Sequence, residues 1–486
     1  VPELLDPLLA ELGGVARAIV LMAGQLGGEV DVPALRQQLA QIGPEAIAEP
    51  ALHGVAVPAA LDRHVHKARL ASALRLSLAS AVRQAPMAEA LFDALGTLPG
   101  GLLQALLPQE ERTALGDGLA ALLDHHLVQL AGEQRRIMMA APVRAWAWQR
   151  WQSAAALESR HLVEVVHEGL AAYASHLKKA LGTPDAQAAR LQFLTESSNL
   201  IQLLQLRTGP LWPAEDDPVA ASVLRSASLF AQYGGTAHSM LPLLEPMAVS
   251  LFERAAETHS AALVMFSLAG MKMRTNDLAG ARQAYEQALP IYRQIEDRLG
   301  EANVLQSMGQ LALAEQHPRE AFALMLQVKD LQVGIDDRLG LGGTHGYMSR
   351  IAAAIGALEQ AVGLAGRALA IFEQVDDRFG QILALQDLGQ ALLRAQPELG
   401  IACLMQAQER AAAIGHPPAD RLGEFIHSLR PDEVSTEDFA AALAQLRAQA
   451  GGLMKEMFAR ADAAVSSGQL DLYELPAEDA GGHDAD

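Results

Sequence analysis

Two short groups of histidines are the side chains best placed for metal or acid–base chemistry. His64 and His66 are two residues apart, and Asp124-His125-His126 forms the second group. Ligands at that spacing suit a strand or loop, but no third ligand follows at a spacing that zinc sites use. The sequence therefore predicts surface histidines and no metal site. The single cysteine, Cys403, stands in an apolar stretch without a recognisable histidine context, so we expect an inert, buried thiol.

The sequence also lacks the motifs that bind nucleotide phosphates or catalyse acyl transfer. No G-x-x-x-x-G-K-S/T loop is present, so the chain cannot form the usual phosphate cradle. No G-x-S-x-G elbow is present either. None of the lysines follows a glycine-rich loop: Lys67, Lys178, Lys179, Lys272, Lys329 and Lys455. We expect no catalytic residue and no cofactor in this chain, with ATP or ADP and Mg²⁺ relevant only if an ATPase core lies upstream.

One phrase recurs and organises the second half of the chain. Ile295–Gly300 reads IEDRLG, Ile335–Gly340 reads IDDRLG and Val375–Gly380 reads VDDRFG, so the glycines are 40 residues apart, and a looser copy ends at Gly423. A fixed period of this length indicates stacked units of two helices each. The shared Asp-Arg pair is expected to cap the first helix and to tie neighbouring loops. The third copy is the weakest, because Gly342-Gly343 and Gly356 interrupt its expected helices.

A second pattern runs in phase with this phrase. Ala281, Ala321 and Ala361 recur at the same place in the second helix, and small residues also recur in the first helix. Small residues at a helix crossing let the two backbones approach closely. The pattern resembles the tetratricopeptide repeat, although the period exceeds the usual 34 residues. The resemblance implies a superhelix, an α-solenoid, over residues 218–430.

In that family the first helix of each repeat lines the inner groove. The resemblance places there a set of polar side chains: Asn303, Gln306, Gln310, Arg350, Gln386 and Gln390. Amides can both donate to and accept from a peptide backbone. The groove is therefore a candidate site for a protein or peptide partner, and the alternative is that these amides merely solvate a curved face.

Length and composition limit the possible functions. A chain of 486 residues should form two to four modules. Half of the residues are hydrophobic and only 4% aromatic, which favours helix-on-helix packing. A net charge of −20 argues against nonspecific binding to nucleic acid or to anionic membranes. The sequence shows no membrane span, and its single cysteine suits a reducing compartment, so we expect a cytoplasmic protein.

The first half is expected to hold a helical segment at 1–84 and a winged helix at 87–152. Short helices are predicted at 87–95, 102–107 and 115–126, followed by a hairpin of 127–130 and 136–139 around a glycine-bearing turn. Residues 155–208 are predicted to form a helical linker pair, and the proline-rich stretch 209–218 a linker. A capping helix is expected at 435–465 and a disordered acidic tail at 466–486, with Asp471 to Asp486 the acidic part.

Four phrases resemble those of STAND (NB-ARC-type) signalling ATPases of bacteria. Leu12–Ile19 is similar to their GLPLA element, Leu91–Gly101 and Ile137–Ala147 to their winged helix, and Leu191–Leu200 to the LxxExxNL phrase of their helical linker. The resemblance implies the C-terminal half of such a protein. The family's methionine-histidine-aspartate triplet corresponds to Met139-Ala140-Ala141, so the histidine and the carboxylate of its phosphate sensor are missing.

A winged helix could instead bind DNA. The helix that would enter the groove carries Asp117 and Asp124 and neither Arg nor Lys, whereas phosphate contacts need cations. Arg135 and Arg136 on the wing are too few to reverse this, so the sequence favours a module that packs against protein.

Together these patterns predict an all-α fold with a regulatory, partner-binding function. The chain is expected to be the sensor region of a STAND-type signal-transduction protein, of the kind found in bacterial defence, that controls an ATPase or effector module and oligomerises on activation. The alternatives are a free-standing tetratricopeptide scaffold or adaptor and, less favoured, a winged-helix transcriptional regulator. The sequence does not identify the sensed partner, the effector or the oligomeric state.

Overall fold

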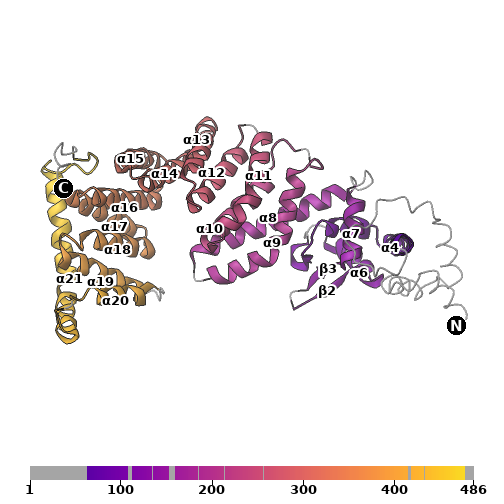
Figure 1. Ribbon diagram of the computed structural model, residues 1–486, viewed down its shortest axis with the longest axis horizontal. Coiled ribbons are helices and arrows are strands. Elements are labelled where there is room, and N and C mark those ends of the chain that lie inside the picture. The colour runs from indigo at the N-terminus through magenta and orange to yellow at the C-terminus, as the bar shows by residue number, and fades with distance from the viewer. Residues whose placement is uncertain are drawn as a thin grey trace, which may run out of the picture. The chain divides into compact units, whose positions relative to one another are not determined.

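A computed structural model describes residues 63–107, 112–133, 135–152, 159–183, 185–212, 214–255, 257–413, 418–431 and 433–476. These residues form eighteen α-helices and one small three-stranded sheet (Figure 1). The chain divides into two compact units, Val1–Met271 and Lys272–Asp486. Most of the predicted helical segment at 1–84 lies outside the described residues, and its last part is helix α4 (Arg63–Gln84).

The predicted winged-helix segment holds three helices and the sheet. Helices α5 (Met87–Gly96), α6 (Arg112–Asp124) and α7 (Ala141–Trp151) enclose a core that includes Phe92, Leu115, Ile137 and Trp146. The predicted hairpin is confirmed, with β2 (Gln129–Ala131) antiparallel to β3 (Arg136–Met138).

The helix predicted at 102–107 is wrong in its first residues. Leu102–Leu103 form strand β1, which pairs with β3 on the side opposite β2, and a single 3-10 turn, η2 (Gln104–Leu106), follows. The cause is Gly101, whose φ of 69° turns the chain toward β3. A Cβ at this position would collide with the carbonyl oxygen of Ile137, so the turn also requires glycine for space.

Helix pairs complete the first unit. The predicted linker pair is helical, as α8 (Arg160–Lys179), the turn η4 (Ala180–Gly182) and α9 (Ala186–Thr208). Helices α10 (Pro218–Gly234) and α11 (Ala237–Ala255) follow, and the boundary between the units falls within α12 (His259–Arg274). The stretch between α9 and α10 is not helical, as predicted, but it is packed, since Trp212 is buried and Asp217 caps α10 by accepting a hydrogen bond from the Ala220 N–H.

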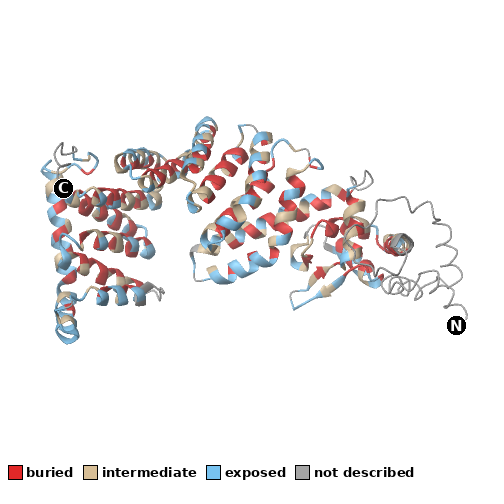
Figure 2. Cartoon of the chain, viewed as in Figure 1, coloured by how far each residue is buried: buried red, intermediate tan, exposed pale blue. Residues whose placement is uncertain are grey.

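The second unit is a regular series of antiparallel helix pairs. Its helices are α13 (Leu278–Gln294), α14 (Arg298–Ala314), α15 (Pro318–Gly334), α16 (Arg338–Ala354), α17 (Leu358–Gln374), α18 (Arg378–Leu392), α19 (Pro397–Ala413), α20 (Pro418–Ser428) and α21 (Thr436–Ser466). Figure 2 shows buried residues on the facing sides of these helices and exposed residues on their outer sides.

The repeated phrase forms the loop and cap before each first helix. Asp297 and Asp337 accept hydrogen bonds from the N–H of Gly300 and Gly340, at 2.8 and 2.9 Å, and Asp377 caps α18 in a similar way. The predicted capping is therefore confirmed. The predicted tie between neighbouring loops is not found for Arg338, whose Nε lies 3.2 Å from Asp336 in its own loop.

Small residues allow each pair to pack closely. Ala281, Ala321 and Ala361 are fully buried, and the Ser349 hydroxyl donates a 2.7 Å hydrogen bond to the carbonyl of Ala361. The expectation that glycines interrupt the third copy is wrong. Helix α16 runs unbroken through Gly342, where a Cβ would lie 2.7 Å from the Phe372 ring, and Gly356 lies in the loop that follows.

The predicted capping helix forms, but it does not cover the end of the series of helix pairs. Its bounds agree with α21, and the Ser435 hydroxyl caps it by accepting from the Asp438 N–H at 3.0 Å. Rather than covering an open end, α21 crosses α17 and α19 (Figure 1). The residues after it, up to Pro476, pack back onto the helix pairs, so the prediction of a disordered tail is wrong for Asp471–Pro476, and the rest of that tail lies outside the described residues. No helix among the described residues is both long and apolar enough to cross a membrane.

Candidate functional site

The predicted groove residues lie on the first helices of three successive pairs. Asn303, Gln306 and Gln310 are on α14, Arg350 is on α16, and Gln386 and Gln390 are on α18. Asn303, Arg350 and Gln390 are exposed, and the other three are half-buried. All six are therefore accessible from the outside of the chain, as a binding face requires.

An exposed apolar residue stands in the first turn of each of these three helices. Leu299, Leu339 and Phe379 are 52%, 55% and 47% exposed and stand 40 residues apart. On α14, Leu299 precedes Asn303 by four residues, and Gln306 and Gln310 continue at spacings of three and four, so these residues share one helix face. We call the corresponding rows on α14, α16 and α18 the first-helix face. Exposed apolar residues that gather on one face can mark a surface that binds other molecules, so the first-helix face is a candidate site.

Two of the predicted residues meet in a hollow. Gln310 and Arg350 line a cavity of about 320 Å³ whose other walls include Leu313, Met325, Tyr347 and Ile351. The guanidinium carbon of Arg350 lies 5.5 Å from the centre of the Tyr347 ring, and its Nε lies 3.8 Å from the Asp387 carboxylate on α18. Asn303, Gln306, Gln386 and Gln390 do not line this cavity.

Asp387 is electrostatically unusual on this face. Burial raises the pKa of its carboxyl group, and the nearby Arg350 guanidinium lowers it in part. Asp387 and Tyr347 were not among the residues predicted from the sequence. Their signal was available, because Ser307, Tyr347 and Asp387 occupy the same place in three successive repeats.

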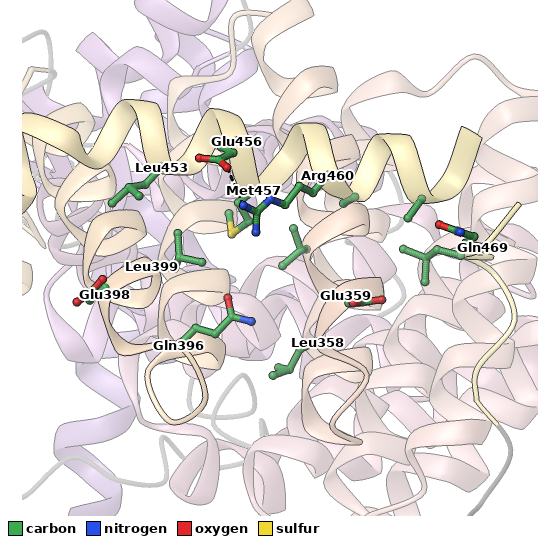
Figure 3. Close-up of a pocket in the computed structure, with 14 residues that line it drawn as sticks. Leu358, Glu359, Gln396, Glu398, Leu399, Leu453, Glu456, Met457, Arg460 and Gln469 are labelled. Carbon is green, nitrogen blue, oxygen red and sulfur yellow. Dashed lines mark hydrogen bonds and ion pairs between the residues drawn. The ribbon is translucent and has the colours of Figure 1, made fainter. Parts of the chain in front are cut away.

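A second hollow lies where α21 crosses the first turns of α17 and α19 (Figure 3). Its volume is about 490 Å³, and its floor is apolar, with Leu358, Leu399 and Met457 among its residues. Its polar groups include three glutamates and one arginine, of which Glu456 and Arg460 form an ion pair at 2.7 Å. The sequence did not predict it, because its walls come from distant parts of the chain.

The histidine groups and the cysteine named from the sequence do not come together in the described part of the chain. His64 and His66 belong to α4, but their side chains lie outside the described residues. His125 was predicted at the surface and is instead buried, which lowers its pKa. In the described part of the chain no three His, Cys, Asp or Glu residues come together as a metal site would need. Cys403 is buried as predicted, and burial raises the pKa of its thiol to about 12.

The wing arginine Arg136 is occupied within the first unit. Its guanidinium forms an ion pair with Glu196 of α9 and donates hydrogen bonds to the carbonyls of Gly100 and Gly101, at 3.1 and 3.3 Å. Asn199 completes this cluster. It accepts a 2.7 Å hydrogen bond from the Gly100 N–H and donates to the Gly101 carbonyl and to Glu196, at 2.7 and 2.8 Å.

These contacts explain the LxxExxNL-like phrase. Its Glu196 and Asn199 lie one helical turn apart, so both point at the turn before β1, while Phe193 and Leu200 are buried among the helices. We call Gly100, Gly101, Arg136, Glu196 and Asn199 the wing lock. The lock fixes the sheet onto α9 through charged and backbone groups that are largely removed from water.

A buried charged cluster fastens the stretch between α9 and α10. The Arg207 guanidinium donates to Asp217 at 2.7 Å and to Nδ1 of His167 at 3.3 Å, and it lies 4.4 Å from the Trp212 ring centre. His167 must be neutral at Nδ1 to accept this bond. Burial, together with the Arg207 charge, lowers the pKa of His167 to about 3.

Comparison with known proteins does not assign the chain to a family. No family model matches the chain, and a search of curated proteins found no match.

Proposed function

We propose that this chain is the regulatory and sensor region of a STAND-type signalling ATPase, in which a tetratricopeptide-like superhelix binds a protein or peptide partner. The observation that carries the proposal is the first-helix face, where an exposed apolar residue repeats on three successive helices, with amides on α14 and α18 and the Arg350–Asp387 pair between α16 and α18. A periodic face of this kind suits an extended partner, which can make the same type of contact with each repeat.

The first unit supports the family assignment. Helices α5 and α6 with the sheet have the element order of a winged helix, and the wing lock gives the LxxExxNL-like phrase a structural role. In this proposal the lock couples the winged helix to the helical pair that precedes the repeats. Met139-Ala140-Ala141 lacks the histidine and carboxylate of the phosphate sensor, so the proposal gives this triplet no role in sensing nucleotide.

Two other functions remain as alternatives. A free-standing scaffold would use the same first-helix face without an ATPase, and the coding sequence upstream of Val1 separates the two, because a P-loop there is required by the proposal. A DNA-binding regulator is less well supported. Arg136 is engaged in the wing lock, which leaves Arg135 as the exposed cation of the turn between β2 and β3.

Peptide display against the immobilised chain tests the binding face. Peptides selected on the parent chain are measured by calorimetry on two variants. One carries alanine at Gln306, Gln310, Arg350, Gln386 and Gln390, and the other carries serine at Leu299, Leu339 and Phe379. We expect at least a tenfold loss of affinity in both, with unchanged thermal unfolding, because these side chains are exposed or half-buried.

The matched control is Val333→Ser, since Val333 is 60% exposed but lies on α15, outside the first-helix face. It should leave the affinity unchanged. Selected peptides that bind both variants as tightly as the parent would place the binding site elsewhere and refute the proposal.

A further inference from the structure

The residues after α21 form an ordered segment that binds back onto the helix pairs. Gly468, with a φ of 72°, reverses the chain, and residues Gln469–Pro476 then lie against α15, α16 and α17. We call Gln469–Pro476 the strap. Its sequence, QLDLYELP, alternates apolar and acidic residues.

A buried amide holds the strap by its backbone. Gln360 of α17 is 3% exposed, and its Nε2 donates hydrogen bonds to the carbonyls of Asp471 and Glu474, both at 2.7 Å. These contacts do not depend on the side chains of the strap. At its end, Arg319 of α15 donates to the carbonyl of Pro476. Recognition of main-chain carbonyls by fixed donors is how proteins hold extended peptides.

The strap's side chains enter specific places. Leu472 is 3% exposed and fills a notch over Gly363, where a Cβ would lie 2.5 Å from its Cδ2 atom. The Tyr473 ring lies 4.8 Å from the Lys329 ammonium group. The Tyr473 hydroxyl lies 3.1 Å from Nε2 of His345, whose Nδ1 lies 2.8 Å from the Leu341 carbonyl. The carbonyl can only accept, so Nδ1 carries the proton and Nε2 accepts from the tyrosine.

The strap leaves one hydrogen-bonding group of the site without a partner. The Gln360 Oε1 atom is buried and has no hydrogen-bond partner among the described residues. Beside the strap lies an open hollow of about 540 Å³, with Arg367 in its wall. A buried acceptor without a donor is unfavourable, so a ligand that supplies an N–H group to Gln360 would bind better than the strap does.

We propose that α15, α16 and α17 form a binding site for an extended Leu-Tyr-containing peptide segment of a partner protein, and that the strap occupies this site as an internal competitor. The chemistry of the occupant follows from the strap: a leucine for the Gly363 notch, an aromatic hydroxyl for His345, and backbone carbonyls for Gln360 and Arg319. This site shares no lining residue with the cavity of the first-helix face, and it does not depend on the function proposed for that face.

The strap sets the threshold for partner binding. A short tether gives an internal ligand an effective concentration in the millimolar range. A partner peptide with the same intrinsic affinity would therefore need a millimolar concentration to displace the strap. A peptide that also donates a hydrogen bond to Gln360 Oε1 would compete at a lower concentration.

Fluorescence anisotropy with a labelled synthetic peptide, GQLDLYELPA, tests the proposal on the full chain. The strap is released by the double substitution Leu472→Ser and Tyr473→Ala. We expect this variant to bind the peptide at least tenfold more tightly than the parent, because its own strap no longer competes. Adding Gln360→Leu to the double variant should reduce the affinity at least tenfold, and adding Gln327→Leu, at an exposed amide on α15, should not.

A second measurement needs no substitution. Unlabelled peptide is added to the parent chain at about ten times the effective concentration of the tethered strap. It should displace the strap and so increase deuterium uptake by the strap amides, which mass spectrometry measures. The proposal is overturned if the peptide binds the parent and the released variant equally, or if binding survives Gln360→Leu. Unchanged deuterium uptake in the strap at that concentration would also overturn it.

Discussion

Replacing Asn199 with alanine tests whether the wing lock stabilises the first unit. Asn199 is fully buried and makes three hydrogen bonds, to the Gly100 N–H, the Gly101 carbonyl and Glu196. A hydrogen bond of this kind contributes about 0.5–1.5 kcal/mol net, and one to a charged group contributes more. Asn199→Ala should therefore lower the free energy of unfolding of the first unit by about 3 kcal/mol.

Tryptophan fluorescence isolates this unit. All four tryptophans, Trp146, Trp148, Trp151 and Trp212, lie in Val1–Met271. Urea titration followed by their emission should therefore report the unfolding of the first unit alone. Ser198→Ala is the matched control, because Ser198 is the exposed neighbour on the same helix, and its removal should change the free energy of unfolding by less than about 0.5 kcal/mol.

Asn199→Asp gives a sharper version of the test. The carboxylate could still accept from Gly100 but could donate neither to Gly101 nor to Glu196, and two carboxylates would face each other at the 2.8 Å contact. Like charges in contact raise the pKa of one group, so this variant should become more stable relative to the parent as the pH falls and one carboxyl group is protonated. Adding Glu196→Gln should recover part of the loss at neutral pH. If Asn199→Ala unfolds at the same urea concentration as Ser198→Ala, the lock contributes nothing and the reasoning fails.

Two further predictions concern burial. Because the folded-state pKa of His167 is about 3, below the ordinary value of 6.5, its contribution to stability is complete above pH 6.5 and is lost as the pH falls toward 3. The tryptophan-monitored free energy of unfolding should fall by roughly 1.4 kcal/mol per pH unit between pH 6 and 4 from this group, and His167→Leu should remove that part of the slope. Ala321→Leu should cost about 1–3 kcal/mol by circular dichroism, because Ala321 is fully buried where two helices cross. Gln327→Leu on the same helix is its control, and equal melting of the two variants would contradict the packing argument.

The sequence predicted the local structure well because its signals were local or periodic. The 40-residue phrase predicted the positions of the helix pairs, and Asp297 and Asp337 cap their helices because the donor N–H lies only three residues away. The hairpin followed from two apolar runs around a glycine. The first-helix face was only partly predicted. Tyr347 and Asp387 stand at equivalent positions of successive repeats, but one is aromatic and the other acidic, so they did not fit the pattern of amides from which the face was predicted.

Contacts between distant residues could not be predicted in this way. Strand β1 forms because Gly101 turns Leu102 against Ile137, and nothing near Leu102 in the sequence indicates that partner. The strap was predicted as a disordered tail from its acidic composition, yet Leu472 finds its notch at Gly363, more than a hundred residues earlier. The role of Gly363 is evident only when Leu472 is in place, because a larger residue at this position would collide with it.

The position of α21 has a mechanical consequence. In a plain array of helix pairs each pair contacts only its neighbours, so a pulling force can peel pairs from one end one at a time. Helix α21 contacts both α17 and α19, and Met454, Met457 and Ala461 share one core with residues of α17, α18 and α19. Helix α21 therefore links these pairs to one another, in addition to the contacts that each pair makes with its neighbours. Under tension the C-terminal pairs should yield together once α21 detaches, and the chain should resist extension there more than at α13 and α14.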